Sequence, residues 1–267
     1  MDFVCVLGKG SKWGDNELRF TLRAIQKYAQ NYDKIVIVGE KPDWIQNVLH
    51  IPCSDIYSPY ENADANIVLK VMAAVYHPEV SDDFIFINDD ELFLAPQDVS
   101  KIEWLHKGQM INFRNETWTR GFWRLRLHRT MRTLVEKKLT TFHYDNHLPV
   151  HMNKKKFLEC MSSFDFGDNI GYTINSMYGN FHKVKGTRLI NHKIRVFGPL
   201  TKKSIEDGVK GRLYMTYNDH GLNQALIDWL HLNYPTPSKY EATQDGIDAI
   251  PKTQLFSTAN SKFPFRK

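Results

Sequence analysis

Short apolar runs separated by longer, periodic segments organise the first part of the chain. The runs cover residues 3–7, 34–38 and 84–87, and their β-branched and aromatic side chains are typical of strands buried on both faces. Between them, residues 15–29 and 62–76 carry apolar side chains at helical intervals, which predicts two amphipathic helices. This alternation of strand and helix predicts an α/β fold with a parallel sheet.

The later part of the chain has weaker patterns. Residues 109–113 predict one more strand, and residues 154–161 and 222–230 predict helices. Asp219 stands shortly before the second of these helices, where an aspartate is a good N-cap. Residues 234–241 form an extended, proline-rich segment.

The apolar run at 84–87 leads directly into Asn88, Asp89 and Asp90. In open α/β sheets, ligands bind outside the carboxyl ends of the strands, so these side chains stand where a site is expected. Adjacent carboxylates repel each other unless a hard divalent cation accepts their oxygens while it also holds a substrate phosphate. The stretch therefore predicts a Mg²⁺ or Mn²⁺ site at Asp89 and Asp90, with a solvated turn as the alternative.

Two features near the N-terminus favour an anionic ligand. Gly8 and Lys9 open a flexible loop that allows a ligand to approach the backbone, although the glycine spacing matches neither a P-loop nor a dinucleotide fingerprint. Arg19 and Arg23 lie one turn apart on the first predicted helix. Arg19 is in the first turn, where the helix macrodipole disfavours a cation unless a phosphate or carboxylate compensates it.

Basic residues are concentrated in two segments. Residues 114–138 hold eight Lys/Arg against two acidic residues, and residues 182–212 hold nine against two, so their net charges are +6 and +7. Because the whole chain carries +5, the remainder carries −8. This segregation favours a polyanionic ligand, either nucleotide phosphates or nucleic acid, with solvated helix faces as the alternative.

The first basic segment interleaves arginine with aromatic residues. Guanidinium groups pair with phosphates while indole rings stack on bases or sugars, which suits nucleic acid or carbohydrate. The alternative is a helix with a buried aromatic face and snorkelling arginines. The candidates for acceptor binding are Arg114, Trp118, Arg120 and Trp123.

Residues 143–151 contain three histidines, His143, His147 and His151, together with Asp145. Histidine serves as a general base or as a metal ligand near neutral pH. The cluster indicates a functional role without selecting one histidine.

Length and composition set the outer bounds. The chain has 267 residues, of which 42% are hydrophobic, and this is enough for one sizeable domain. We divide it into a first half at 1–96, a second half at 97–241 and a tail at 242–267; the resemblance described next implies that the first half binds a nucleotide-sugar and the second half the acceptor. The three cysteines lie far apart without metal-site spacing, and we find no basic leader, no small-residue cleavage site and no 18-residue apolar run, so we expect a cytoplasmic protein without a membrane span.

Taken together, these segments resemble the Stealth family of sugar-1-phosphate transferases, which includes capsule polysaccharide enzymes and the lysosomal-enzyme GlcNAc-phosphotransferase. Residues 15–28, 35–44, 84–94, 147–149 and 235–241 carry the resemblance, in this order. It implies a GT-A-like, Rossmann-like mixed sheet flanked by helices with an elaborated C-terminal half, a divalent metal and a UDP-sugar donor. The functional residues that it implies are Asp15, Arg19, Asn88, Asp89, Asp90 and His147.

One departure concerns residues 7–11, which read Leu-Gly-Lys-Gly-Ser where the family carries a Trp-Val-Asp-Gly run. This leaves open whether the sugar or the sugar-phosphate is transferred. The favoured hypothesis is a metal-dependent glycosyltransferase in which Arg19 and the metal neutralise the leaving phosphate and His147 or Asp15 deprotonates an acceptor hydroxyl.

The acceptor is the least constrained part of this hypothesis. Compact size and basic, aromatic segments also fit the small phage glycosyltransferases that modify hydroxymethylated bases in duplex DNA, in the host cytoplasm. A sugar-1-phosphate transferase, a metal-dependent phosphoesterase and a non-catalytic nucleic-acid-binding protein are the alternatives.

Overall fold

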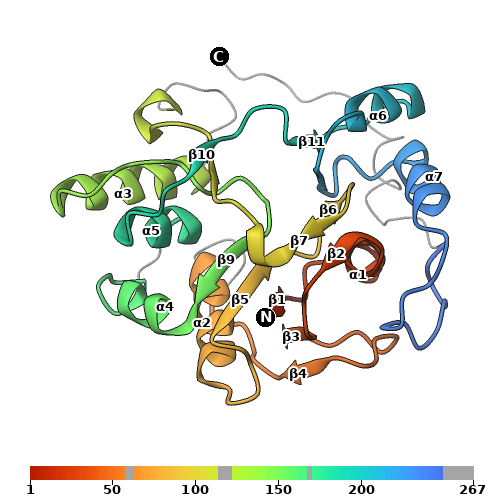
Figure 1. The fold of residues 1–267 in the computed structure, drawn as a ribbon, viewed down its shortest axis with the longest axis horizontal. Coiled ribbons are helices and arrows are strands. Elements are labelled where there is room, and N and C mark those ends of the chain that lie inside the picture. The colour runs from red at the N-terminus through yellow and green to blue at the C-terminus, as the bar shows by residue number, and fades with distance from the viewer. Residues whose placement is uncertain (58–62, 114–121, 167–169, 249–267) are drawn as a thin grey trace.

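A computed structural model describes residues 1–57, 63–113, 122–166 and 170–248. Its centre is a five-stranded sheet with the strand order β4-β3-β1-β5-β9 (Figure 1). Four strands run parallel, and the last is antiparallel to β5. Their bounds are β1 Asp2–Leu7, β3 Ile35–Gly39, β4 Leu49–Ile51, β5 Asp83–Ile87 and β9 Val150–Asn153. The α/β fold expected from the sequence is confirmed.

Two helices cover opposite faces of this sheet, α1 (Asn16–Tyr28) and α2 (Ala63–Tyr76). Because successive side chains of a strand point to opposite faces, Phe3 and Cys5 belong to the core beneath α1, whereas Val4 belongs to the core beneath α2. A strand buried on both sides has to be apolar throughout, which explains the unbroken apolar runs.

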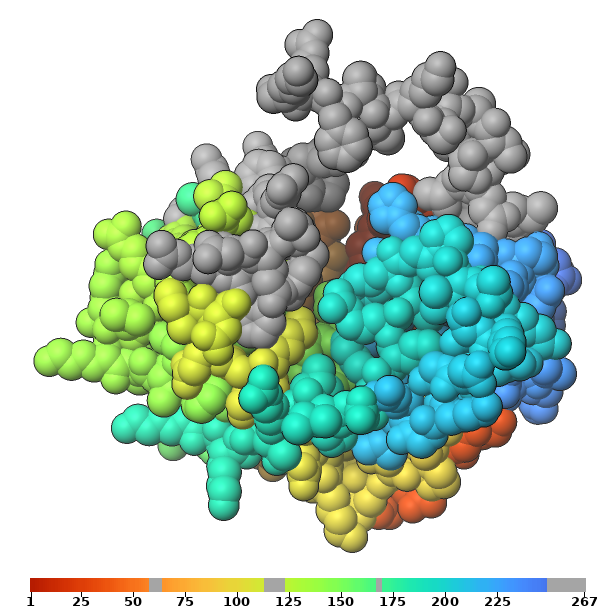
Figure 2. Space-filling model, turned by 90° about the horizontal axis from the view of Figure 1, so that it is seen from above, coloured from red at the N-terminus to blue at the C-terminus, as the bar shows by residue number. Residues whose placement is uncertain are grey.

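The remaining helices form two groups on either side of the sheet (Figure 1). Three extend the core of α2, and two pack into the core of α1. In Figure 2 the yellow-green and the cyan-to-blue parts of the chain meet in the lower part of the view, and dark red N-terminal residues are visible higher up, beside the blue part. The helices are α3 Phe122–Glu136, α4 Lys154–Met161 and α5 Ile174–Phe181 in the first group, and α6 Lys202–Val209 and α7 Gln224–Asn233 in the second.

A three-stranded sheet consists of β11 (Lys193–Val196), β12 (Tyr214–Tyr217) and β6 (Glu91–Phe93). β12 is antiparallel to β6, which begins directly after the predicted acidic site. The residues that follow β12 are therefore close to that site in space. The other described elements are the strand pairs β2 Ala29–Gln30 with β7 Gln97–Asp98 and β8 Leu105–His106 with β10 Thr187–Arg188, and the 3₁₀ helices η1 Val99–Lys101 and η2 Met110–Phe113.

Two sequence predictions of local structure are wrong. Residues 109–113 form no strand, because only Gln109 finds a bridging partner and the chain then turns into η2. The cap of α7 is Asn223, whose side chain accepts the Leu226 N–H at 3.0 Å, so Asp219 is free for another role. The helix predicted at 154–161 is confirmed as α4.

Strand β9, from the second half of the chain, completes the central sheet that the first half begins. None of the three cysteines, all of which the structure describes, forms a disulfide. Among the described residues, no helix is both long and apolar enough to cross a membrane.

Candidate active site

A large hollow lies at the carboxyl ends of β1 and β5. From β1 the chain adds β3 and β4 on one side and then β5 on the other, so a topological switch point lies between β1 and β5. Ligands of doubly wound sheets bind at such points. The cavity there measures about 780 Å³, within the size range of small-molecule sites.

Two adjacent carboxylates, Asp89 and Asp90, face this cavity. The main chain of the turn is anchored at Asp89, because the Thr21 hydroxyl donates to the Asp89 carbonyl at 2.7 Å. Oδ1 of Asp90 is buried and has no hydrogen-bond partner among the described residues. A buried carboxylate oxygen without a partner is costly unless a ligand satisfies it, and a cation is the natural candidate.

The raised pKa values of these carboxylates also favour a bound cation. Burial, together with the nearby Asp15 and Asp219 carboxylates, raises the pKa of Asp89 to about 6. Burial, followed by Asp89 and Glu91, raises the pKa of Asp90 well above its usual value. A divalent cation would relieve this repulsion, so the donor set fits a hard metal ion such as Mg²⁺ or Mn²⁺.

Asn88 and Glu91 hold the shape of the turn. The Asn88 side-chain amide donates to Glu91 Oε1 at 2.6 Å, and the Asn88 backbone N–H donates to Oε2 at 3.3 Å. Glu91 is only 1% exposed and belongs to β6. Asn88 therefore organises the acidic turn and also lines the cavity.

His147 approaches this turn from the loop before β9. One ligand atom from each of Asp90, Glu91 and His147 falls within 4.8 Å of the others. Desolvation by the surrounding protein lowers the pKa of His147 well below its ordinary value, and Lys193 is the strongest of the cations that add to this effect. The imidazole is neutral at physiological pH, the form needed for a metal ligand or a general base.

A second acidic contribution comes from the turn after β12, where Asn218, Asp219 and His220 line the same cavity. Asp219 pairs with Lys12 at 3.3 Å and adds to the negative field at Asp89. Sequence reasoning missed this turn as a site. The signal was present, because a buried strand runs into polar residues here just as at β5.

The far wall of the cavity consists of polar side chains that pair with one another. Lys70 of α2 pairs with Asp55 at 2.5 Å, and Asn66 lies beside them. Gly8 leaves room for this pair, since a Cβ there would lie 3.3 Å from Asp55. Gly39 has φ +113°, and a Cβ would meet the Leu7 carbonyl at 2.2 Å, so only glycine fits. Asp55, Asn66 and Lys70 were not predicted.

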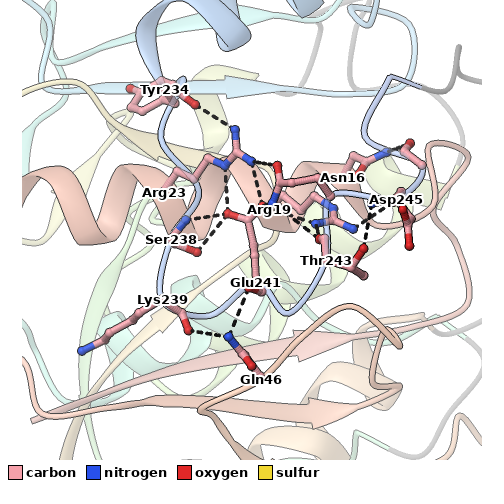
Figure 3. A network of polar contacts seen from close by, with 12 residues as sticks. Asn16, Arg19, Arg23, Gln46, Tyr234, Ser238, Lys239, Glu241, Thr243 and Asp245 are labelled. Atoms are coloured by element: carbon pink, nitrogen blue, oxygen red, sulfur yellow. Dashed lines mark hydrogen bonds and ion pairs between the residues drawn. The ribbon is translucent and has the colours of Figure 1, made fainter.

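Arg19 and Arg23 lie elsewhere (Figure 3). Both are buried, and they share the carboxylate of Glu241 at 3.3 and 2.8 Å. Arg19 also donates to the Thr243 and Asp245 carbonyls. The carboxylate partner that the macrodipole argument requires is thus Glu241. We correct the expectation of a donor phosphate and remove both arginines from the candidate site.

The other predicted residues divide into three groups. Gly8, Lys9, Asn88, Asp89 and Asp90 line the cavity together. Asp15 precedes α1 with φ +57° and makes no side-chain cap, and it contributes charge to the site without lining the cavity. Trp123 lies in an adjoining cleft, whereas Arg114, Trp118 and Arg120 fall outside the described residues.

This adjoining cleft continues from the main cavity. A hollow of about 260 Å³ shares Asn88 with the main cavity and shares Trp123, Asp145 and His147 with a third hollow of about 220 Å³. His147 therefore stands between the acidic turn and a separate pocket, an arrangement that suits a reaction between two ligands.

Comparison with protein families gives no match, and comparison with curated proteins gives none either. Among solved structures, the chain is similar to an active-site mutant of LgtC (9% identity, TM-score 0.47, covering 90% of this chain and 98% of that one). It is also similar to the galactosyltransferase LgtC in complex with donor and acceptor sugar analogues (11%, 0.46, 90% and 98%).

A third similar structure is the apo form of WbbM, a bifunctional glycosyltransferase (11% identity, TM-score 0.48, 89% of this chain and 50% of that one). The chain thus spans about half the length of WbbM. At 9–11% identity, these likenesses carry no information about the chemistry of the site.

Proposed function

We propose that this protein is a metal-dependent glycosyltransferase that uses a nucleotide-sugar, a UDP-sugar in the first instance, as its donor. One observation carries the proposal: the partnerless Oδ1 of Asp90 beside Asp89, at the switch point of the sheet, in a cavity of about 780 Å³. A half-buried carboxylate pair with one buried, partnerless oxygen calls for a cation, and the cavity beside it has room for a nucleotide-sugar.

Asp89, Asp90 and Asp219 are the proposed ligands of Mg²⁺ or Mn²⁺. When bound, the metal supplies positive charge that neutralises the diphosphate of the donor. The loop at 8–11 lies against the donor, and the wall formed by Asp55, Asn66 and Lys70 offers both hydrogen-bond donors and acceptors to its nucleoside end.

His147 is the proposed general base. Its neutral imidazole lies beside Asp90, at the junction of the two hollows, where an acceptor hydroxyl would meet the donor. As the acceptor oxygen bonds to the anomeric carbon, the bond from that carbon to the phosphate oxygen breaks and the acceptor proton passes to His147. The nucleoside diphosphate leaves. Asp15, the other predicted base, does not line the cavity.

The test is incubation with UDP-sugars and Mn²⁺, followed by analysis of the released nucleotide. Sugar transfer releases UDP. Release of UMP would instead show attack at phosphorus and would identify the sugar-1-phosphate transferase implied by the Stealth resemblance. If no nucleotide is released with any donor, and Mn²⁺ does not bind, the protein is not a transferase of this kind.

The acceptor proposed from charge and size, a hydroxymethylated base in duplex DNA, is tested in the same assay. Hydroxymethylated DNA is compared with unmodified DNA and with small glycan acceptors across about 50 to 200 mM salt, because contacts to many phosphates make binding strongly salt-dependent. Transfer to hydroxymethylated DNA alone would support that acceptor.

A further inference from the structure

The pocket beyond His147 has a composition that the proposed reaction does not explain. It measures about 220 Å³, and it is lined by three cations, Lys107, Lys193 and Arg195, and by the rings of Trp123 and Phe197. Lys193 and Arg195 alternate on β11, so both point to the same face of that strand. The pocket therefore combines positive charge with flat apolar walls.

The cations hold the loop that carries His147 through main-chain oxygens. Lys107 Nζ donates to the Asp145 carbonyl at 2.8 Å, and Lys193 Nζ donates to the carbonyls of Asn146 and, at 3.2 Å, His147. Carbonyl groups accept hydrogen bonds without cancelling charge. The pocket thus keeps a positive field around the proposed base.

Asp145 is the one carboxylate that lines this pocket among the described residues. Its oxygens accept the backbone N–H groups of Asn175 and Ser176 at 3.1 and 3.0 Å, at the N-terminus of α5. The positive end of that helix already compensates its charge. Among the described residues, the pocket is therefore lined by three basic side chains and by one carboxylate that the N-terminus of α5 holds.

The aromatic rings of the pocket indicate a second property of its ligand. The guanidinium carbon of Arg195 lies 4.4 Å from the centre of the Phe197 ring, and Trp123 forms another side of the pocket. Such rings offer apolar faces for a sugar ring, while guanidinium and ammonium groups bind carboxylate or phosphate. The volume has room for about one sugar unit.

We propose that the acceptor is an anionic sugar, a uronate or a sugar phosphate, whose charged group binds Arg195, Lys193 and Lys107 while its hydroxyl faces His147. This inference rests on the proposed function and names the acceptor class of the same site. The acidic turn on the far side of His147 repels the anionic group, so the two fields orient the acceptor with its hydroxyl toward the donor.

A polymer backbone is the less favoured occupant. Nucleic acid requires a basic stripe on the surface, whereas these cations surround a small hollow. Several exposed basic residues outside it are already paired with acids on their own helices. The pairs are Arg132 with Glu136 at 2.7 Å, Lys210 with Asp207 at 2.7 Å and Lys202 with Glu206 at 4.0 Å.

The experiment compares matched acceptors, methyl glucuronide with methyl glucoside and glucose 6-phosphate with glucose, in wild type and in Arg195→Gln. We expect wild type to prefer the anionic member of each pair by about tenfold or more in kcat/KM, because charge-assisted hydrogen bonds are the strong ones. Arg195→Gln should reduce this preference about tenfold, and Arg195→Lys should restore part of it.

The matched control is Arg212→Gln, which changes an arginine that donates to Asn191 outside the pocket. It should leave the preference unchanged. Binding of the same acceptors without donor, measured by calorimetry, tests the pocket even if no turnover occurs. If the anionic sugars bind selectively but no nucleotide is released, the proposed function is wrong and the pocket still binds anionic sugars.

Three results would overturn the inference. Equal binding and turnover of charged and neutral sugars would show that the cations serve only to offset the acidic turn. A higher donor KM in Arg195→Gln with an unchanged acceptor preference would assign the pocket to the donor. Transfer to hydroxymethylated DNA, with neither binding nor transfer to the anionic sugars, would make the acceptor a polymer.

Discussion

Two groups of carboxylates in this molecule have opposite environments. Glu241 is enclosed by the guanidinium groups of Arg19 and Arg23 (Figure 3), and it also accepts the Ser238 N–H at 2.8 Å. Burial alone would raise the pKa of Glu241, but the hydrogen bonds, led by that from Arg23, outweigh it and lower the pKa to about 2. At the acidic turn, burial instead raises the pKa of Asp89 to about 6.

The difference separates a structural ion pair from a candidate site. Glu241 has its cations within the protein, and the result is a clamp that ties the segment after α7 to α1. Asp90 has a carboxylate oxygen for which the described residues offer no donor. A folded protein retains such an oxygen at the expense of stability, which is reasonable where a ligand completes it.

The largest expected effect is on the clamp. Glu241→Ala leaves two buried guanidinium groups without their carboxylate, and breaking a buried pair from one side costs about 3–5 kcal/mol. Unfolding in urea should show this loss of stability. Arg132→Ala, which breaks an exposed pair with Glu136, serves as the control and should change stability by less than about 1 kcal/mol. A Glu241→Ala protein of normal stability would refute the clamp.

The acidic turn should respond in the opposite way. Asp90→Asn removes a repelled charge, so stability should be unchanged or higher, whereas kcat should fall at least about 100-fold, or about 2.7 kcal/mol, because the metal is held less well. Mn²⁺ should raise the Tm of wild type but not of the variant. Asp43→Asn, at an exposed position, is the control. Full Mn²⁺-dependent activity in Asp90→Asn would remove the turn from the site.

The two regions should also give opposite pH dependences of stability. Burial raises the pKa of Glu17, which lines the cavity, to about 7, so the folded state binds an extra proton and stability should fall as pH rises from about 4.5 to 7. Glu241, with its lowered pKa, should lose its contribution as pH falls from about 4.5 to 2.

Glu17→Gln should therefore remove roughly 2 kcal/mol of the decline toward neutral pH, measured as ΔG of unfolding against pH. The acid-side decline should remain in this variant. An unchanged profile between pH 4.5 and 7 would show that Glu17 ionises as freely in the folded protein as in the unfolded chain.

The smallest expected effect concerns Asp219. Asp219→Asn should weaken Mn²⁺ binding about tenfold, a loss of one of several charged ligands. Lys12→Ala, which removes the partner of Asp219, should leave binding equal or slightly tighter, because a competing cation is lost. Weaker binding in Lys12→Ala and unchanged binding in Asp219→Asn would reverse this assignment.

The sequence by itself determined the central elements and the acidic turn. Unbroken apolar runs at 3–7, 35–38 and 84–87 have few alternatives to a strand buried on both faces, and each lies in one. Asn88, Asp89 and Asp90 follow the last of these runs, so their place at a carboxyl end was readable before their neighbours were known. Local periodicity likewise sufficed for α4.

Only the tertiary structure decided which distant residues meet. Arg19 carried a readable requirement for an anion, but the choice between a ligand phosphate and Glu241, which is 222 positions away, depends on how the segment after α7 packs. Asp219 lies at the site because β12 pairs with β6. Lys193 and Arg195 line a pocket because β11 pairs with β12. Strand order and long-range packing depend on how many surfaces are buried together. The local pattern of charge and hydrophobicity around one residue does not specify this.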